Sequence, residues 1–193
     1  MTFKVAHGFV DGGYLRFRAQ DAKRSLLNPR ILVQYVADTQ GYTWSKTLRL
    51  ERVTYYDAIP DNESELSHNL KDYWDAVELL PDTQLGFGSL RGGTRKKPKR
   101  QKGVDTLIAV DMLVGVFTGV YSTAVLVAGD ADFVPVINEV QRRGAKVIVA
   151  GVEASVSSDL RRAADRFVDL DSNLDVQKFP PLKVNGREWK AIS

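Results

Sequence analysis

The sequence predicts an α/β protein of three layers, in which helices cover both faces of a central, mostly parallel sheet. Apolar segments typical of buried strands alternate along the chain with segments whose apolar residues recur at helical spacing. This rhythm is typical of βαβ units, which place their strands parallel to one another. With 193 residues, of which 44% are hydrophobic, the chain can bury one sizeable core. We therefore expect one domain at residues 1–170 and a tail at residues 171–193.

In the first half of the chain, local patterns predict three strands and three helices. Residues 3–10 are apolar and extended, and the polar stretch 14–23 follows as a helix. Apolar residues at helical spacing predict helices at 29–38 and 64–80. Alternation rich in Val, Thr and Tyr predicts a strand at 48–58, and residues 83–90 favour another strand.

The second half is more apolar and continues the same alternation. We expect helices at 105–116, 133–143 and 157–164, and strands at 123–128, 145–150 and 167–170. Gly144 suits the C-terminal cap of the helix before it. The run at 124–128, which follows Thr123, is apolar throughout, which predicts a strand buried on both faces of a parallel sheet.

Composition excludes several classes of protein. The chain has no cysteine, which excludes a disulfide framework and a thiolate metal site. No nucleophile elbow, P-loop or complete dinucleotide-binding motif is present. The N-terminus lacks a secretory pattern, and the longest apolar stretch, 107–117, is interrupted by Asp111 and is too short to cross a bilayer. We expect a cytoplasmic protein without a membrane segment.

Four carboxylates stand at the ends of predicted elements. Asp11 ends the first strand, Asp105 opens the helix at 105–116, and Asp130 and Asp132 follow the strand at 123–128. If those two strands are neighbours, their carboxyl ends frame the crevice in which open α/β sheets bind ligands. Crowded carboxylates favour a bound dication, and oxygen ligands suit Mg²⁺ or Mn²⁺. The pattern therefore predicts a metal site.

Each acid also has a local explanation. Asp is a favoured N-cap, so Asp105 and Asp132 can simply begin helices, and Asp11 can form a turn before two glycines. Asp111 follows Asp105 by six residues, which puts the two on different faces of a helix. Asp111 is therefore either a candidate to support the metal ligands from behind or a buried structural acid.

Positive charge is concentrated in one loop that contains Gly and Pro, residues 92–102. Seven basic residues lie in it or beside it: Arg91, Arg95, Lys96, Lys97, Lys99, Arg100 and Lys102. Without them the net charge of +3 becomes −4 for the rest of the chain. The segment is either a solvated loop or an arm that binds nucleic-acid phosphates. Because it leads directly into Asp105, we favour the second interpretation.

Four segments resemble motifs of the NYN domains of the LabA-like group, bacterial relatives of the PIN-like nucleases. They are FVDG at 9–12, KGVD at 102–105, GDADFVP at 129–135 and SDLRRAADRFVDL at 158–170. The resemblance implies a PIN-like fold in which the first and fourth strands are adjacent. It also implies Mg²⁺- or Mn²⁺-dependent cleavage of RNA, with Asp11, Asp105, Asp130 and Asp132 as the catalytic, metal-binding set.

These observations favour a metal-dependent ribonuclease that hydrolyses phosphodiester bonds of RNA, with single-stranded RNA preferred. The alternative is a catalytically weak or inactive NYN module that binds RNA or acts as a regulatory protein. Two departures from the family pattern favour the alternative: Tyr14 stands where many relatives carry Asn, and Ala128 where many carry Ser or Thr. A homodimer or a protein partner is compatible with both.

Overall fold

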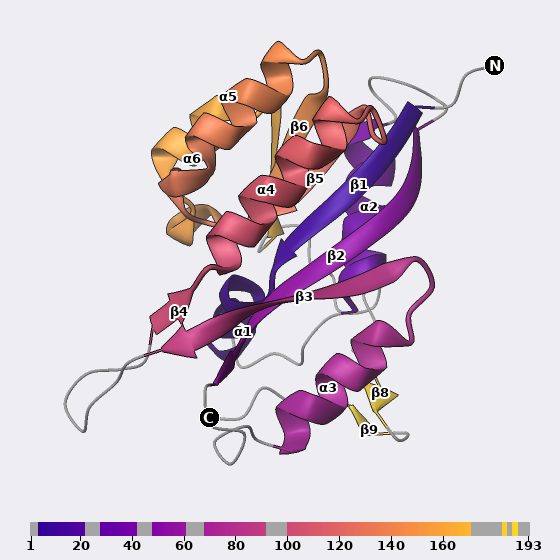
Figure 1. Cartoon of the computed structure of the whole chain (residues 1–193), viewed down its shortest axis with the longest axis vertical. Coiled ribbons are helices and arrows are strands. Elements are labelled where there is room, and N and C mark those ends of the chain that lie inside the picture. Colours follow the sequence, from indigo (N-terminus) through magenta and orange to yellow (C-terminus); the bar gives the residue numbers. More distant parts are fainter. Residues whose placement is uncertain are drawn as a thin grey trace.

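The computed structural model describes residues 4–21, 28–41, 48–60, 68–91, 100–170, 183–184 and 187–188. Within these residues a seven-stranded sheet is covered by helices on both faces (Figure 1). The strand order is β4-β3-β2-β1-β5-β6-β7, and β1 pairs in parallel with both β2 and β5. The predicted three-layer α/β/α architecture is confirmed, as is the adjacency of the first strand and the strand at 123–127.

All strands of this sheet are parallel except one short strand at its edge. The parallel strands are β1 Lys4–Asp11, β2 Leu48–Pro60, β3 Thr83–Arg91, β5 Thr123–Val127, β6 Lys146–Gly151 and β7 Arg166–Asp169. The edge strand, β4 Arg100–Lys102, pairs antiparallel with β3. Every residue of β5 is buried, because helices cover both faces of the sheet and leave this central strand no solvent-exposed side.

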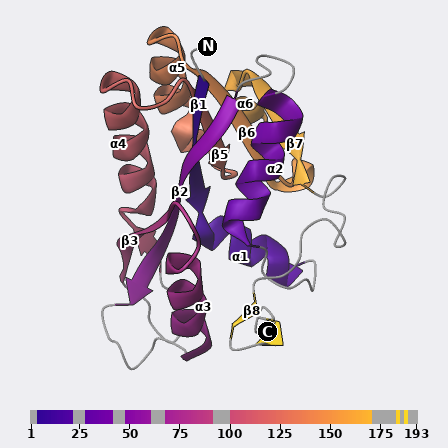
Figure 2. The same cartoon turned by 90° about the vertical axis from the view of Figure 1, so that its right-hand side faces the viewer.

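The helices divide between the two faces of the sheet. α1 Gly12–Asp21, α2 Pro29–Gly41 and α3 His68–Glu78 pack on one face, and α4 Val104–Phe117, α5 Val134–Arg142 and α6 Ser158–Ala163 pack on the other. Figure 2 shows α2 and α4 on opposite sides of the sheet. No helix in the described part of the chain is long and apolar enough to cross a bilayer.

Several element boundaries differ from those that the sequence predicts. α1 begins at Gly12 rather than at residue 14, because the Asp11 carboxylate accepts a hydrogen bond from the Tyr14 amide and starts the helix directly after β1. Residues 100–102 form β4 instead of a loop, because their backbone groups pair with the end of β3. A short 3₁₀ turn, Ala131–Phe133, precedes α5, and another, Glu153–Ser155, precedes α6.

The C-terminal tail is described only in two short segments. β8 Lys183–Val184 and β9 Arg187–Glu188 form an antiparallel pair, and β8 lies beside α3. The rest of the predicted tail, residues 171–182 among it, lies outside the described residues.

Candidate functional site

The chain changes its direction of winding between β1 and β5, and two of the predicted acids lie at this point. From β1 the sheet continues through β2 and β3 on one side and through β5, β6 and β7 on the other. Asp11 is the last residue of β1, and Asp130 lies just beyond the end of β5. Since parallel strands end at the same edge, both acids lie at the switch point of the sheet, where open α/β folds bind their ligands.

The alternation of side chains along the strands decides which face these acids occupy. Phe9 of β1 and Leu126 of β5 pack in the apolar cluster beneath α4. Asp11 is two residues after Phe9 in the same strand, so its side chain points to the α4 face as well. Asp105 lies in the first turn of α4. Residues from three elements are therefore directed to one corner of the molecule.

The acids influence one another electrostatically. Burial raises the pKa of Asp11 to about 6, the negative charges of Asp105 and Asp57 add to the rise, and the backbone hydrogen bond from Tyr14 opposes it. Partial loss of solvent contact around its carboxylate raises the pKa of Asp105, a residue at the surface, and the charges of Asp130 and Asp132 add to this shift. The four predicted acids, Asp11, Asp105, Asp130 and Asp132, thus share one electrostatic neighbourhood at the carboxyl edge of the sheet.

Two of these acids also organise the backbone around them. One oxygen of Asp11 accepts the Tyr14 amide at 3.0 Å, and one oxygen of Asp130 accepts the Asp132 amide at 3.0 Å. The N-cap explanation is wrong for Asp105, because Gly103 occupies the N-cap of α4, and wrong for Asp132, because Asp130 is the cap of its turn. Asp105 is therefore left without a capping role.

The carboxylates are near one another but do not already converge on a point. Within the described parts of the chain, no three His, Asp or Glu side chains lie close enough to hold one ion between them. The donor set consists of carboxylate oxygens, which are the ligands that Mg²⁺ and Mn²⁺ prefer. Asp105, Asp130 and Asp132 are exposed, whereas Asp11 is buried. The residues present therefore fit a hard dication by the chemistry of their oxygen donors.

Asp111 has a different neighbourhood. Its carboxylate accepts a hydrogen bond of 2.7 Å from the Tyr56 hydroxyl, and the residue is exposed. Its charge is not among those that raise the pKa of Asp105. The interpretation of Asp111 as a buried structural acid is therefore wrong: this acid lies on the surface of α4 and connects the helix to β2.

A buried ion pair next to the site was not anticipated from the sequence. Asp57, near the end of β2, is fully buried and accepts hydrogen bonds from Arg16 Nε at 3.0 Å, Arg16 Nη2 at 2.5 Å and Trp74 Nε1 at 2.9 Å. Arg16 belongs to α1, so this pair holds the helix that follows Asp11 against β2 and α3. The sequence did contain a sign of Asp57, because this acid lies near the carboxyl end of a predicted strand, as Asp11 does.

Tyr14, which departs from the family pattern, has a structural role. Its hydroxyl accepts the Val152 amide at 2.9 Å and lies 3.0 Å from Ser155 Oγ. A Cβ at Gly129 would lie 2.6 Å from the Tyr14 ring, so the ring fills the space beneath the residue that precedes Asp130. Tyr14 therefore ties α1 to the segment after β6 and restricts position 129 to glycine.

The predicted nucleic-acid-binding residues lie partly outside the described chain. The backbone of Arg91 ends β3, and Arg100 and Lys102 belong to β4, which runs through Gly103 directly into α4. Arg95, Lys96, Lys97 and Lys99 lie outside the described residues. The backbone thus brings the end of the basic segment to the helix that carries Asp105.

Comparison with known proteins agrees with this fold. The sequence pattern of the NYN domain matches residues 9–171. In sequence, the chain is 24% identical over 173 residues to the low amplitude and bright protein LabA of Synechococcus elongatus. This alignment covers 89% of this chain and 84% of LabA. It is 38% identical over 92 residues to the uncharacterized protein MJ0482 of Methanocaldococcus jannaschii, an alignment that covers 46% of this chain and only 38% of that longer protein.

One solved structure supports the architecture. It is the crystal structure of VPA0982, a protein of unknown function from Vibrio parahaemolyticus, which superposes with a TM-score of 0.59 at 20% identity. The superposition covers 88% of this chain and 94% of that one, so the two share a fold over nearly their whole lengths. Together with the match over residues 9–171, these similarities show that the chain belongs to the NYN domain family, in its LabA-like group within the PIN-like nuclease superfamily.

Proposed function

We propose that this chain is a metal-dependent ribonuclease, and that Asp11, Asp105, Asp130 and Asp132 hold a Mg²⁺ or Mn²⁺ ion at the carboxyl edge of the sheet. The observation that carries the proposal is the position of Asp11, Asp105 and Asp130 at one corner of the carboxyl edge, where burial first and neighbouring negative charges second raise the pKa values of Asp11 and Asp105. Carboxylates that repel one another in the folded protein are stabilised by a cation. Membership of a nuclease superfamily supports nucleic acid as the substrate.

Each residue contributes to a site of this kind in its own way. A bound dication supplies Lewis-acid stabilisation of the phosphate charge and lowers the pKa of a coordinated water. Asp11 and Asp130 are held by backbone amides and would form the fixed side of the site. The carboxylates of Asp105 and Asp132 accept no hydrogen bond from the described residues and would form its adjustable side. The basic segment 91–102 would bind RNA phosphates without reading bases, as expected for a single strand bound with weak sequence preference.

The direct test is hydrolysis of a labelled single-stranded RNA in the presence of Mg²⁺ or Mn²⁺. We expect cleavage by the wild type, loss of cleavage with a chelator, and a fall of roughly 100-fold or more in Asp130→Asn, because a metal ligand is removed. Asp82→Asn is the matched control: Asp82 lies before β3, at the opposite edge of the sheet, and Asn tolerates its positive φ of 51°. Cleavage that survives both chelation and Asp130→Asn would refute the proposal.

The second candidate is an NYN module that binds RNA without efficient hydrolysis. It is favoured by the lack of a converged group of three metal-binding side chains among the described residues, and by Tyr14 in its structural role. Tight RNA binding with no cleavage under any divalent ion would support this candidate over the first.

A further inference from the structure

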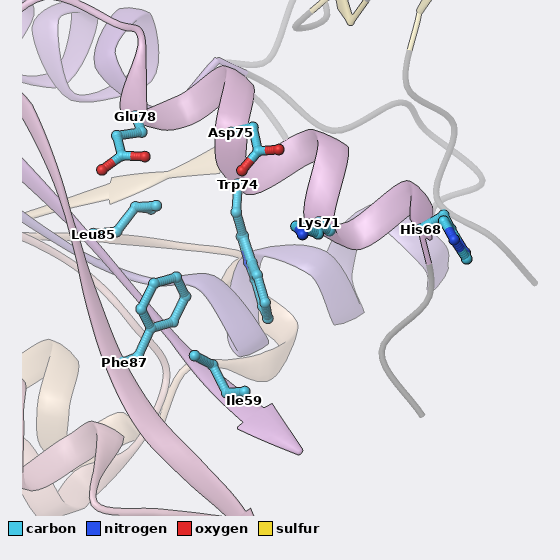
Figure 3. Close-up of a pocket in the computed structure, with 8 residues that line it drawn as sticks. All are labelled: Ile59, His68, Lys71, Trp74, Asp75, Glu78, Leu85 and Phe87. Atoms are coloured by element: carbon cyan, nitrogen blue, oxygen red, sulfur yellow. The ribbon is translucent and has the colours of Figure 1, made fainter. Parts of the chain in front are cut away.

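A groove lies on the face of the sheet opposite the acidic cluster. It has a volume of about 440 Å³ and runs between α3 and the neighbouring strands β2 and β3 (Figure 3). Its floor is apolar, formed by Ile59, Trp74, Leu85 and Phe87. We propose that this groove binds one nucleotide of a single-stranded RNA, with the base on the aromatic floor and the phosphate at the N-terminal end of α3. The inference rests on the proposed function only in taking RNA as the substrate.

The floor presents an aromatic ring that is held in place. Trp74 and Phe87 meet edge to face, with ring centroids 4.9 Å apart and an interplanar angle of 63°. Trp74 is buried and donates its indole N–H to Asp57, so it cannot turn away. Phe87 packs against it and remains 38% exposed. Phe87 is thus a partly exposed aromatic ring backed by the fixed Trp74, and such a ring suits the stacking of a nucleobase, since every base has a π face.

The polar side of the groove has one sign of charge at each end. His68 and Lys71 lie in the first turn of α3, and Asp75 and Glu78 lie further along the same helix (Figure 3). Within the described residues Lys71 forms no ion pair, and the helix N-terminus adds partial positive charge at this end.

This distribution of charge selects the class of ligand. A phosphate matches the basic end, and the amino groups of a base are donors for the carboxylates at the other end. A simple anion would leave the apolar floor unused, and an apolar ligand would leave the charged wall unused. A nucleotide uses both.

The register of the sheet places the groove within reach of the acidic cluster. Asp11 of β1 pairs with Tyr56 of β2, and Tyr56 pairs with Gly86 of β3, so Phe87 is one residue beyond this row. Two strand spacings correspond to about 10 Å between the backbones, and the side chains of Asp11 and Phe87 leave the sheet on opposite faces. α3 ends just before β3 begins, so its basic N-terminal end lies toward the carboxyl edge of the sheet, the edge that carries Asp11. An RNA strand that crosses this edge can place a phosphate at the acids and a nearby base in the groove.

Binding of a fluorescent single-stranded RNA to the full chain, measured by anisotropy in EDTA so that no cleavage occurs, tests the inference. We expect Phe87→Ala to weaken binding about tenfold, because a stacked base is lost, and Phe87→Tyr to bind like the wild type. Phe117→Ala is the matched control, since Phe117 is 54% exposed on α4, on the other face of the sheet.

A second pair of variants tests the phosphate end without altering the floor. Lys71→Ala should weaken binding and reduce the slope of log affinity against log salt by about one phosphate contact. Lys4→Ala is its control, because Lys4 is exposed at the start of β1, on the amino edge of the sheet. The wild type should bind an RNA with one abasic site more weakly than it binds the intact RNA. Phe87→Ala should bind the two RNAs equally well, because it has already lost the stacking contact.

Two results would overturn the inference. One is equal RNA affinity of the wild type, Phe87→Ala and Lys71→Ala. The other is binding of free AMP with no binding of the oligonucleotide, which would make the groove a mononucleotide site. Failure of the groove and failure of the proposed hydrolysis are separable. Weaker binding in Phe87→Ala together with no metal-dependent cleavage by the wild type supports the groove and refutes the hydrolysis. Unchanged binding in Phe87→Ala together with metal-dependent cleavage by the wild type refutes the groove and supports the hydrolysis.

Discussion

Replacing Asp11 by Asn should stabilise the protein, because Asp11 is held in a site that opposes its charge. Burial and neighbouring negative charges raise its pKa from 3.8 to about 6 in the folded state. A difference of this size between the folded and unfolded states corresponds to about 3 kcal/mol at a pH above both values. Asn has nearly the same shape and still accepts the Tyr14 amide as an N-cap. Asp11→Asn should therefore raise the free energy of unfolding at pH 8 by up to about 3 kcal/mol.

The stabilisation must also depend on pH with a defined sign. Because the folded protein binds the Asp11 proton more tightly than the unfolded chain does, this group lowers the free energy of unfolding as the pH rises from 3.8 to about 6. The difference between wild type and Asp11→Asn should be near zero at about pH 3.5, grow through that window, and stay constant above it. Urea unfolding followed by circular dichroism in the presence of EDTA measures it.

Asp165 provides a control of opposite sign. Partial burial raises its pKa, but hydrogen bonds from Lys146, the Val147 amide and Gln141 outweigh this effect and lower it. Asp165→Asn should therefore destabilise the protein above about pH 4, whereas Asp11→Asn stabilises it. A loss of stability in Asp11→Asn at pH 8, or a difference that does not change with pH, would refute the view that the site opposes the charge of Asp11.

Two further substitutions test the supports of the site, both by urea unfolding. Arg16→Met leaves the carboxylate of Asp57 buried without its cation and should lower the free energy of unfolding by about 3–5 kcal/mol. Arg161→Met, which breaks an exposed pair with Glu153, should change it by less than about 1 kcal/mol, and equal effects of the two would contradict this account. Gly129→Ala places a Cβ 2.6 Å from the Tyr14 ring and should lower stability by roughly 1–3 kcal/mol. The double variant with Tyr14→Leu should recover part of that loss, and strictly additive effects would show that the ring does not cause the strain.

Local patterns predicted helices and strands well where the residues of a segment strongly prefer either the interior or the surface. The apolar run at 124–127 lies in a fully buried central strand, since a run of apolar residues has no stable position at the surface. Local patterns failed where a distant partner decides the outcome. Residues 100–102 are basic and polar, and they form a strand only because the end of β3 offers them backbone partners.

For the candidate site, too, the sequence predicted some features and the structure decided others. The sequence alone predicted Asp11, Asp105, Asp130 and Asp132 as candidate site residues, because acids that follow buried strands or open the next helix stand out against an apolar background. It could not decide between local capping and a shared site, because both require the same residue types at the same positions. The structure makes Asp130 a cap, shows that Asp105 is not one, and makes both part of one electrostatic neighbourhood.

The sequence by itself determined most of the helices and strands, the layered architecture and the acids at the strand ends, because these depend on periodicity and on short-range preferences. Only the tertiary structure decided which charges interact, that Asp57 is neutralised by Arg16 while Asp11 lies among like charges, and that Trp74 and Phe87 form the floor of one groove. Those relations join residues far apart along the chain. Their energies depend on distance and on burial, and both are set by the packing of the sheet against its two helical layers.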